Sequence, residues 1–265
     1  MNYSYILKKQ LMSLNNGSLE AELICKPTPQ QLKELKRGSG HPEKEIKQVN
    51  SSAGLAVNYW RAYELCHNKS SVEFEWKKQV PLRRGRRANV DVVVRENNVI
   101  NFIESKFLEP YYSNNEIPRE SYLDSSKYST YTKDFPDSWV SLFDKASKYE
   151  YYNVTQLSRH LLAISKDIWA NPNLYHNKEI RFISITWEMP DSFLHLLPSE
   201  IAKEFEQRRK KIEVEANKSV YLFNSFIKKH LHFKNFEYLT LTYNEIIKDI
   251  RNNKYLSQLK QRYFL

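Results

Sequence analysis

The stretch ANVDVVVRENNVINFIESKF, residues 88–107, decides the fold of this chain. Two apolar runs flank Asn97-Asn98, and asparagine tolerates the positive φ angles that a two-residue hairpin turn requires. We therefore predict two antiparallel strands joined at these asparagines, with Glu96 facing Val99 as the first pair.

Counting inward from that pair places Asp91 opposite Glu104 and Asn89 opposite Lys106. Side chains alternate between the two faces of a strand, so Lys106 and Glu104 point to the same side. Two carboxylates and one ammonium group are thus predicted to converge on one face of the hairpin. The opposite face is predicted to be apolar and to hold Val90, Val92, Val94 and Ile103.

Two facing carboxylates conflict with ordinary sheet design, because like charges directly opposite each other destabilise a sheet and apolar flanks bury them. A divalent cation between Asp91 and Glu104 removes this conflict. Mg²⁺ is favoured because it binds one or two carboxylates, keeps several waters and accepts phosphate oxygens, and Mn²⁺ can substitute for it. The backbone carbonyl of Ser105 is a candidate third ligand.

Such a site indicates hydrolysis of phosphodiester bonds. A bound metal generates hydroxide and stabilises the leaving oxygen, while Lys106 offers a positive charge to the attacking water or to the developing negative charge. The competing interpretation is an exposed ladder of salt bridges on an edge strand. The apolar residues around Asp91 and Glu104 argue against it.

The rest of the chain predicts one α/β domain, mixed α+β in character, with a central mixed sheet flanked by helices. Residues 1–40 form a weakly patterned N-terminal arm, residues 41–187 the core, and residues 188–265 a helical extension with a late strand. Helical spacing covers 41–65, with a break at Ser51-Ser52, and then 154–169, 198–230 and 244–260. Strands are predicted at 71–80, 180–187 and 236–243. Residues 108–137, rich in tyrosine and proline, are expected to form an irregular insertion.

The charge balance favours a polyanionic partner. The chain has 41 Lys and Arg against 31 Asp and Glu, a net charge of +10, which is typical of proteins that bind nucleic acid. Four arginines precede the Asp91 strand and are predicted to contact the DNA backbone, although a solvated turn is the alternative: Arg83, Arg84, Arg86 and Arg87. No apolar run is long enough for a membrane span and no signal peptide is visible, so we expect no membrane partner and a cytoplasmic protein.

Asp91 on one strand followed by Glu104-Ser105-Lys106 on the next resembles the PD-(D/E)xK nuclease superfamily, which includes many restriction endonucleases. The similarity covers residues 41–187, where a helix, a three-stranded meander, a helix and a strand follow in the family's order. Val90 stands where the family often has proline before the aspartate. The resemblance implies a restriction-endonuclease-like core that cleaves DNA with a divalent metal.

The resemblance also implies further site residues. The family often adds a glutamate from the helix before the meander, for which Glu45 is the candidate and Glu43 the substitute. Glu73 and Glu75 on the preceding strand are rivals, because both are expected to point to one side. Gln156, on the helix after the meander, is similar to a glutamine that the family often carries near its site. His160, four residues later, could be a general base, but a lone histidine on a helix is usually structural or lies on the surface, so Gln156 is the better candidate.

The function predicted from these features is that of a Mg²⁺-dependent endonuclease for double-stranded DNA, either a type II restriction-like enzyme or a phage or repair nuclease. No GxxxxGK[ST] motif is present, so no ATPase part is expected. A homodimer is plausible because two symmetry-related sites can cut two strands. The alternatives are a non-catalytic nucleic-acid-binding protein on the same fold and an RNA nuclease.

Overall fold

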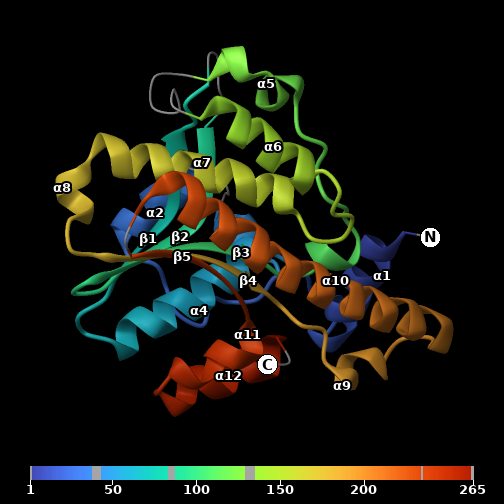
Figure 1. Ribbon diagram of the computed structural model, residues 1–265. Coiled ribbons are helices and arrows are strands. Elements are labelled where there is room, and N and C mark those ends of the chain that lie inside the picture. Colours follow the sequence, from blue (N-terminus) through green and yellow to red (C-terminus); the bar gives the residue numbers. More distant parts are fainter. Residues whose placement is uncertain (1, 38–42, 83–86, 129–134, 234, 264–265) are drawn as a thin grey trace.

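A mixed five-stranded sheet forms the centre of the molecule (Figure 1). The computed structural model describes residues 2–37, 43–82, 87–128, 135–233 and 235–263. Its strands lie side by side in chain order: β1 (Ser71–Gln79), β2 (Arg87–Arg95), β3 (Val99–Lys106), β4 (Glu179–Thr186) and β5 (Phe236–Thr242). β1, β2 and β3 are antiparallel neighbours, whereas β4 and β5 run parallel to β3. The predicted α/β class with a central mixed sheet is confirmed.

Helices cover both faces of this sheet. α4 (Ser52–Cys66) and α12 (Asn253–Tyr263) lie on one side, and α7 (Val154–Ala170) and α10 (Ser199–Phe226) on the other (Figure 1). Both faces of the central strands are therefore shielded from water, which explains why β2 and β3 are nearly continuous apolar runs. Val92, Val93, Phe102 and Ile103 are all fully buried.

The hairpin register agrees with the prediction from the turn as far as Val92 and Ile103, whereas the predicted pairs Asp91–Glu104 and Asn89–Lys106 lie beyond the regular pairing. Glu96 and Val99 exchange two backbone hydrogen bonds, of 2.9 and 3.3 Å, and Val92 pairs with Ile103. One detail of the turn was wrong, because neither Asn97 nor Asn98 has a positive φ. Tertiary contacts hold the turn instead: the backbone N–H of Glu179 donates to the Asn98 carbonyl at 2.7 Å, and the Lys178 ammonium donates to the Asn97 carbonyl.

The two N-terminal segments differ in how well the sequence predicted them. The break at Ser51-Ser52 is confirmed, since α3 (Glu43–Ile46) ends before it and α4 begins at Ser52. The N-terminal arm, in contrast, contains two helices, α1 (Tyr3–Leu14) and α2 (Pro29–Arg37). Each buries only two residues, Leu7 with Leu11 and Gln31 with Leu35, which leaves too weak an apolar pattern to recognise.

The described part of the insertion after β3, residues 108–128, is largely irregular, as predicted, and contains the short helical turns η1 (Glu109–Tyr111), α5 (Glu120–Leu123) and η2 (Ser125–Lys127). α6 (Pro136–Ala146), which begins at its C-terminal end, was missed. Of its tyrosines, Tyr111 and Tyr122 are buried and pack against the core, whereas Tyr131 lies outside the described residues.

The C-terminal half contains α8 (Pro172–Tyr175), α9 (Asp191–Leu194) and the long α10, which continues into the π-helical turn η4 (Ile227–Leu231). The expected terminal helix is interrupted, because α11 (Tyr243–Ile246) and η5 (Ile247–Asp249) precede α12. Buried Ile250 follows this turn in extended backbone and anchors the interruption to the core. Within the described ranges, no helix combines the length and apolar character that a membrane span needs.

We predict that Gly54→Ala destabilises the protein. A Cβ at this position of α4 would lie 2.6 Å from the Ile46 carbonyl oxygen and 3.3 Å from that of Gln48. Overpacking of this kind costs about 1–3 kcal/mol, whereas helix propensity alone predicts a gain of about 1 kcal/mol. Urea denaturation measures the change, and an increase in the free energy of unfolding would contradict the close approach of α3 and α4.

Candidate active site

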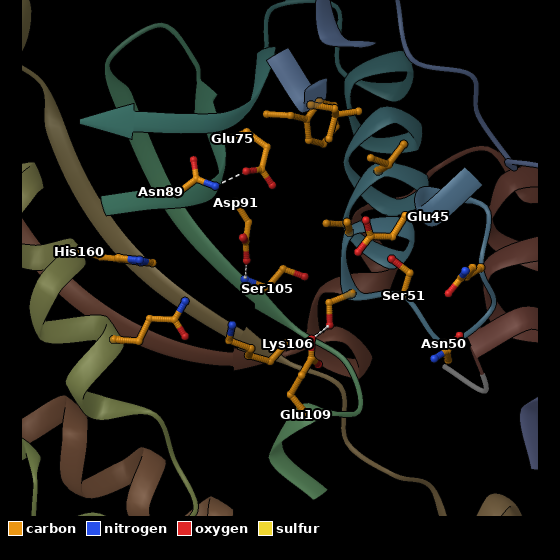
Figure 2. Close-up of a pocket in the computed structure, with 18 of the residues that line it drawn as sticks. Glu45, Asn50, Ser51, Glu75, Asn89, Asp91, Ser105, Lys106, Glu109 and His160 are labelled. Atoms are coloured by element: carbon orange, nitrogen blue, oxygen red, sulfur yellow. Dashed lines mark hydrogen bonds between the residues drawn. The ribbon is translucent and has the colours of Figure 1, made fainter. Parts of the chain in front are cut away.

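A hollow of about 460 Å³ opens where β1, β2 and β3 meet the N-terminal end of α4 and the N-terminal half of α7 (Figure 2). Lys106 is one of its cationic side chains, and four carboxylates line it: Glu45, Glu75, Asp91 and Glu109. Glu104 is only 1% exposed and lines an adjoining hollow of about 340 Å³, which shares Lys106, Glu109 and Gln156 with the first. The two hollows therefore meet around Lys106.

Asp91 lies in the opening between β2 and β3. The regular pairing of these strands ends at Val92 and Ile103, and beyond it the Asp91 carboxylate accepts the backbone N–H of Ser105 at 2.8 Å. The N–H and C=O of one strand residue point the same way, so the Ser105 carbonyl also points toward β2. The Lys106 carbonyl points toward β4, where it accepts the N–H of Trp187. The Asp91 carboxylate and the Ser105 carbonyl thus face the same opening.

Glu104 is held by three side chains. Its Oε1 accepts the Lys106 ammonium at 2.7 Å and the Gln156 amide at 2.8 Å, and its Oε2 lies 3.1 Å from the Nδ1 of His160. Gln156 and His160 are four residues apart on α7 and therefore neighbours on one helix face. The buried carboxylate thus has a cation and two polar groups around it.

Opposite pKa shifts follow from these surroundings. Burial, and then the negative charges of Glu104 and Glu75, raise the pKa of Asp91 well above its usual value, although Lys106 works in the other direction. Burial alone would also raise the pKa of Glu104, but Lys106 and His160 outweigh it and lower this pKa to about 2. Burial disfavours the charged form of Lys106, yet Glu104 and Asp91 raise its pKa above the ordinary lysine value. The site thus favours the charged forms of Glu104 and Lys106 and disfavours the charged form of Asp91.

A backbone irregularity brings Glu75 into the hollow. Glu75 has a φ of 56°, in the middle of β1, and its carboxylate accepts the side-chain amide of Asn89. The alternation of faces changes here, because Phe74 lines the hollow whereas the Trp76 ring packs against Phe102, 5.0 Å away. In a regular strand these two side chains would share a face.

In β2, the strand that pairs with β1, the alternation of side-chain faces changes at the same place. Phe74 pairs with Val92 and Trp76 with Val90, and paired residues share a face. Val90 and Val92 therefore do not point to one common side, as strict alternation had predicted. Asp91 lies between them at the irregular point and reaches the main chain of β3.

Glu109 was not recognised from the sequence. Its carboxylate accepts the Ser52 hydroxyl and the backbone N–H of Phe107, the latter at 3.0 Å, and so joins the start of α4 to the end of β3. Glu109 lies in a segment expected to be irregular, and only its closeness to Lys106 in the sequence could have drawn attention to it.

Of the remaining predicted site residues, some line the hollow and others do not. Glu45 and Arg87 line the hollow, whereas Glu73 forms a 2.7 Å ion pair with Arg95 and is not part of its wall. Of the two rival carboxylates on β1, only Glu75 reaches the site. Three arginines of the basic turn and the side chain of Glu43 fall outside the described residues: Arg83, Arg84 and Arg86.

The donor set fits a hard divalent cation. It offers carboxylate oxygens and a backbone carbonyl, the ligands that Mg²⁺ accepts, and a cation beside Asp91 would offset the burial and repulsion that disfavour its charged form. Over the described part of the chain, no three His, Cys, Asp or Glu side chains are gathered closely enough to form a complete metal site. Asp91 accepts a hydrogen bond from Ser105, whereas Glu104 contacts Lys106, Gln156 and His160.

The sheet order and the position of Asp91 and Glu104 at the end of its central hairpin place the chain among restriction-endonuclease-like nucleases. A family model described as "Restriction Endonuclease associating with ARP" matches residues 7–264, and the chain belongs to this family. The match includes residues 188–264, for which the sequence resemblance had no counterpart. Searches of curated proteins and of solved structures gave no match.

We predict that Asp91→Asn stabilises the metal-free protein at neutral pH. Because the folded-state pKa of Asp91 is raised, the folded protein binds this proton more tightly than the unfolded chain does. Stability from this group is fully present at low pH and is lost as the pH rises through the folded-state pKa. The asparagine variant avoids that loss and keeps an acceptor for the Ser105 N–H.

Thermal unfolding in EDTA measures this effect, with an increase of about 2–4 °C in Tm for each kcal/mol gained. The difference between variant and wild type should shrink as the pH is lowered. Asp144→Asn, which removes an exposed carboxylate, is the control and should change Tm little. A lower Tm for Asp91→Asn at neutral pH would contradict the raised pKa.

Proposed function

We propose that this protein is a Mg²⁺-dependent endonuclease that hydrolyses phosphodiester bonds of double-stranded DNA, as a type II restriction-like enzyme or a phage or repair nuclease. One observation carries the proposal: Lys106 lies 2.7 Å from the buried carboxylate of Glu104, and both adjoin the opening that contains Asp91. Two carboxylates and a lysine in this arrangement match the chemistry that phosphodiester hydrolysis requires.

The roles follow from the positions of the groups. Asp91, Glu104 and the Ser105 carbonyl would hold the cation, with Glu45 beside them in the wall of the hollow. When bound, the cation supplies Lewis-acid stabilisation of the phosphate and an activated water. Lys106 is charged and lines both hollows, so it can stabilise negative charge that develops on the phosphate. Gln156 orients Glu104.

Charge supports DNA as the substrate. The chain has a net charge of +10, and two of its arginines, Arg87 and Arg159, line the hollow next to the carboxylates. Arginines in this position can pair with phosphates on either side of the cleaved bond. The basic segment 83–86 directly precedes Arg87 in the sequence, and we include it in the same proposed DNA contact.

The proposal includes further features that accompany a restriction-type enzyme. We treat residues 1–265 as one nuclease domain in the cytoplasm, where chromosomal or invading DNA is accessible. A homodimer would bring one site to each DNA strand. The family description names an association with ARP, and we extend this association to the chain.

A different class, a nucleic-acid-binding protein without catalysis, would have the same net charge. It would have no need for two buried carboxylates beside a lysine, since such a group costs stability that only a function can offset. An RNA nuclease remains the alternative within the nuclease class. A cleavage assay separates the DNA endonuclease, the binding protein and the RNA nuclease.

Purified wild type is expected to cut plasmid DNA with Mg²⁺ or Mn²⁺ and not with EDTA. Asp91→Ala and Lys106→Ala are each expected to lower the rate at least about 100-fold, because each removes charge stabilisation at the reacting phosphate. Gel electrophoresis of the products measures the rate, and structured RNA is the parallel substrate.

Glu73→Ala is the matched control, because it removes a carboxylate of β1 that lies outside the hollow. It should retain wild-type activity. DNA binding without cleavage under every metal condition would instead support the binding protein, and cleavage of RNA alone would support the RNA nuclease.

A further inference from the structure

His160 contacts Glu104 from the side of α7. The imidazole is 1% exposed, and its Nδ1 lies 3.1 Å from Glu104 Oε2. Neither atom forms a hydrogen bond of regular geometry with any described residue, so this 3.1 Å contact joins two buried polar atoms that otherwise lack a partner. A proton on Nδ1 makes the contact attractive and allows a small rotation of the imidazole to complete an N–H···O hydrogen bond, whereas the other tautomer would place two lone pairs against each other.

The three contacts leave the Glu104 carboxylate little freedom. A carboxylate offers about four acceptor positions, two on each oxygen. Lys106 and Gln156 use both positions of Oε1, and His160 lies 3.1 Å from Oε2. The positions that remain for a cation therefore lie on Oε2, the oxygen that His160 contacts.

The three partners differ in how easily a cation can replace them. Lys106 is 21% exposed at the end of a flexible chain, and its positive charge competes directly with a metal. Gln156 and His160 belong to a 17-residue helix whose stripe of Leu157, Leu161 and Ile164 is buried. A cation can displace the ammonium from Glu104, while the contacts from α7 remain.

We propose that His160 is a positioning residue for the metal site: its Nδ1–H holds Glu104 in the orientation that binds a divalent cation. The inference rests on the proposed function and assigns to His160 a role beyond packing. Packing alone would be the alternative, since the imidazole also lies 6.5 Å from the Phe182 ring. The two explanations differ in what an apolar ring at position 160 would do.

The test compares His160→Phe, which keeps a ring and removes the donor, with His160→Asn, whose amide can replace Nδ1–H. Isothermal titration calorimetry with Mn²⁺ and with Mg²⁺ measures cation binding. Loss of a partner that orients a metal ligand typically weakens metal binding about 10–100-fold. We expect that loss for His160→Phe, with at least partial recovery in His160→Asn.

Two further measurements separate positioning from a general loss of structure. Binding of a labelled DNA duplex in EDTA should be unchanged in both variants, because it does not require the cation. Ser158→Ala is the control on the same helix: it removes a buried hydroxyl that bonds only within α7, to the Val154 carbonyl, and should bind Mn²⁺ as wild type does. If His160→Phe does not fold, His160→Met provides an apolar replacement that adapts its shape.

The proposal is overturned if His160→Phe binds cations as tightly as wild type, or if His160→Asn is as weak as His160→Phe. It is also overturned if the wild type binds neither Mn²⁺ nor Mg²⁺. A wild type that binds Mn²⁺ but cuts no DNA would remove the proposed function alone, and the comparison of the two variants would still decide the role of His160.

Discussion

Repulsion between Asp91 and Glu104 is the constraint on which the site depends. The hairpin fixes both carboxylates near one point, where burial prevents water from screening them. Lys106 pairs with Glu104, while burial and the charge of Glu104 disfavour the ionised form of Asp91 beside it. A protein would not retain such an arrangement for stability, since a buried and incompletely paired carboxylate is costly. Under the proposed function, a cation in the opening would offset this cost.

The surrounding fold supplies what this charged centre lacks. Apolar side chains of the central strands, such as Val92, Val93, Phe102 and Ile103, are fully buried, and each stabilises the fold by about 1.5–3 kcal/mol. The helices on the two faces then contribute polar groups at one end of the sheet only. α4 brings Ser52 to Glu109, and α7 brings Gln156 and His160 to Glu104. The apolar residues that stabilise the fold and the polar residues of the candidate site thus lie in different parts of the same strands.

The sequence predicted what depends on short-range rules. A two-residue turn and alternating strands fixed the pairing of Val92 with Ile103, and this brought Asp91 close to Glu104. It missed the helices of the N-terminal arm, which bury only two residues each. It also missed α6, although the buried Trp139, Leu142, Phe143 and Ala146 of this helix have helical spacing. Helical spacing identified Gln156 and His160 as neighbours, but only the position of α7 over β3 shows that both reach one carboxylate.

Glu75 shows how an irregular backbone serves this arrangement. A non-glycine residue with φ near 56° costs about 1–3 kcal/mol, a cost that glycine would avoid. Glycine would, however, remove the carboxylate that accepts the Asn89 amide beside Asp91. Selection for a more stable chain and selection for the charge pattern of the hollow therefore oppose each other at this one position, and the presence of glutamate indicates which of the two has prevailed.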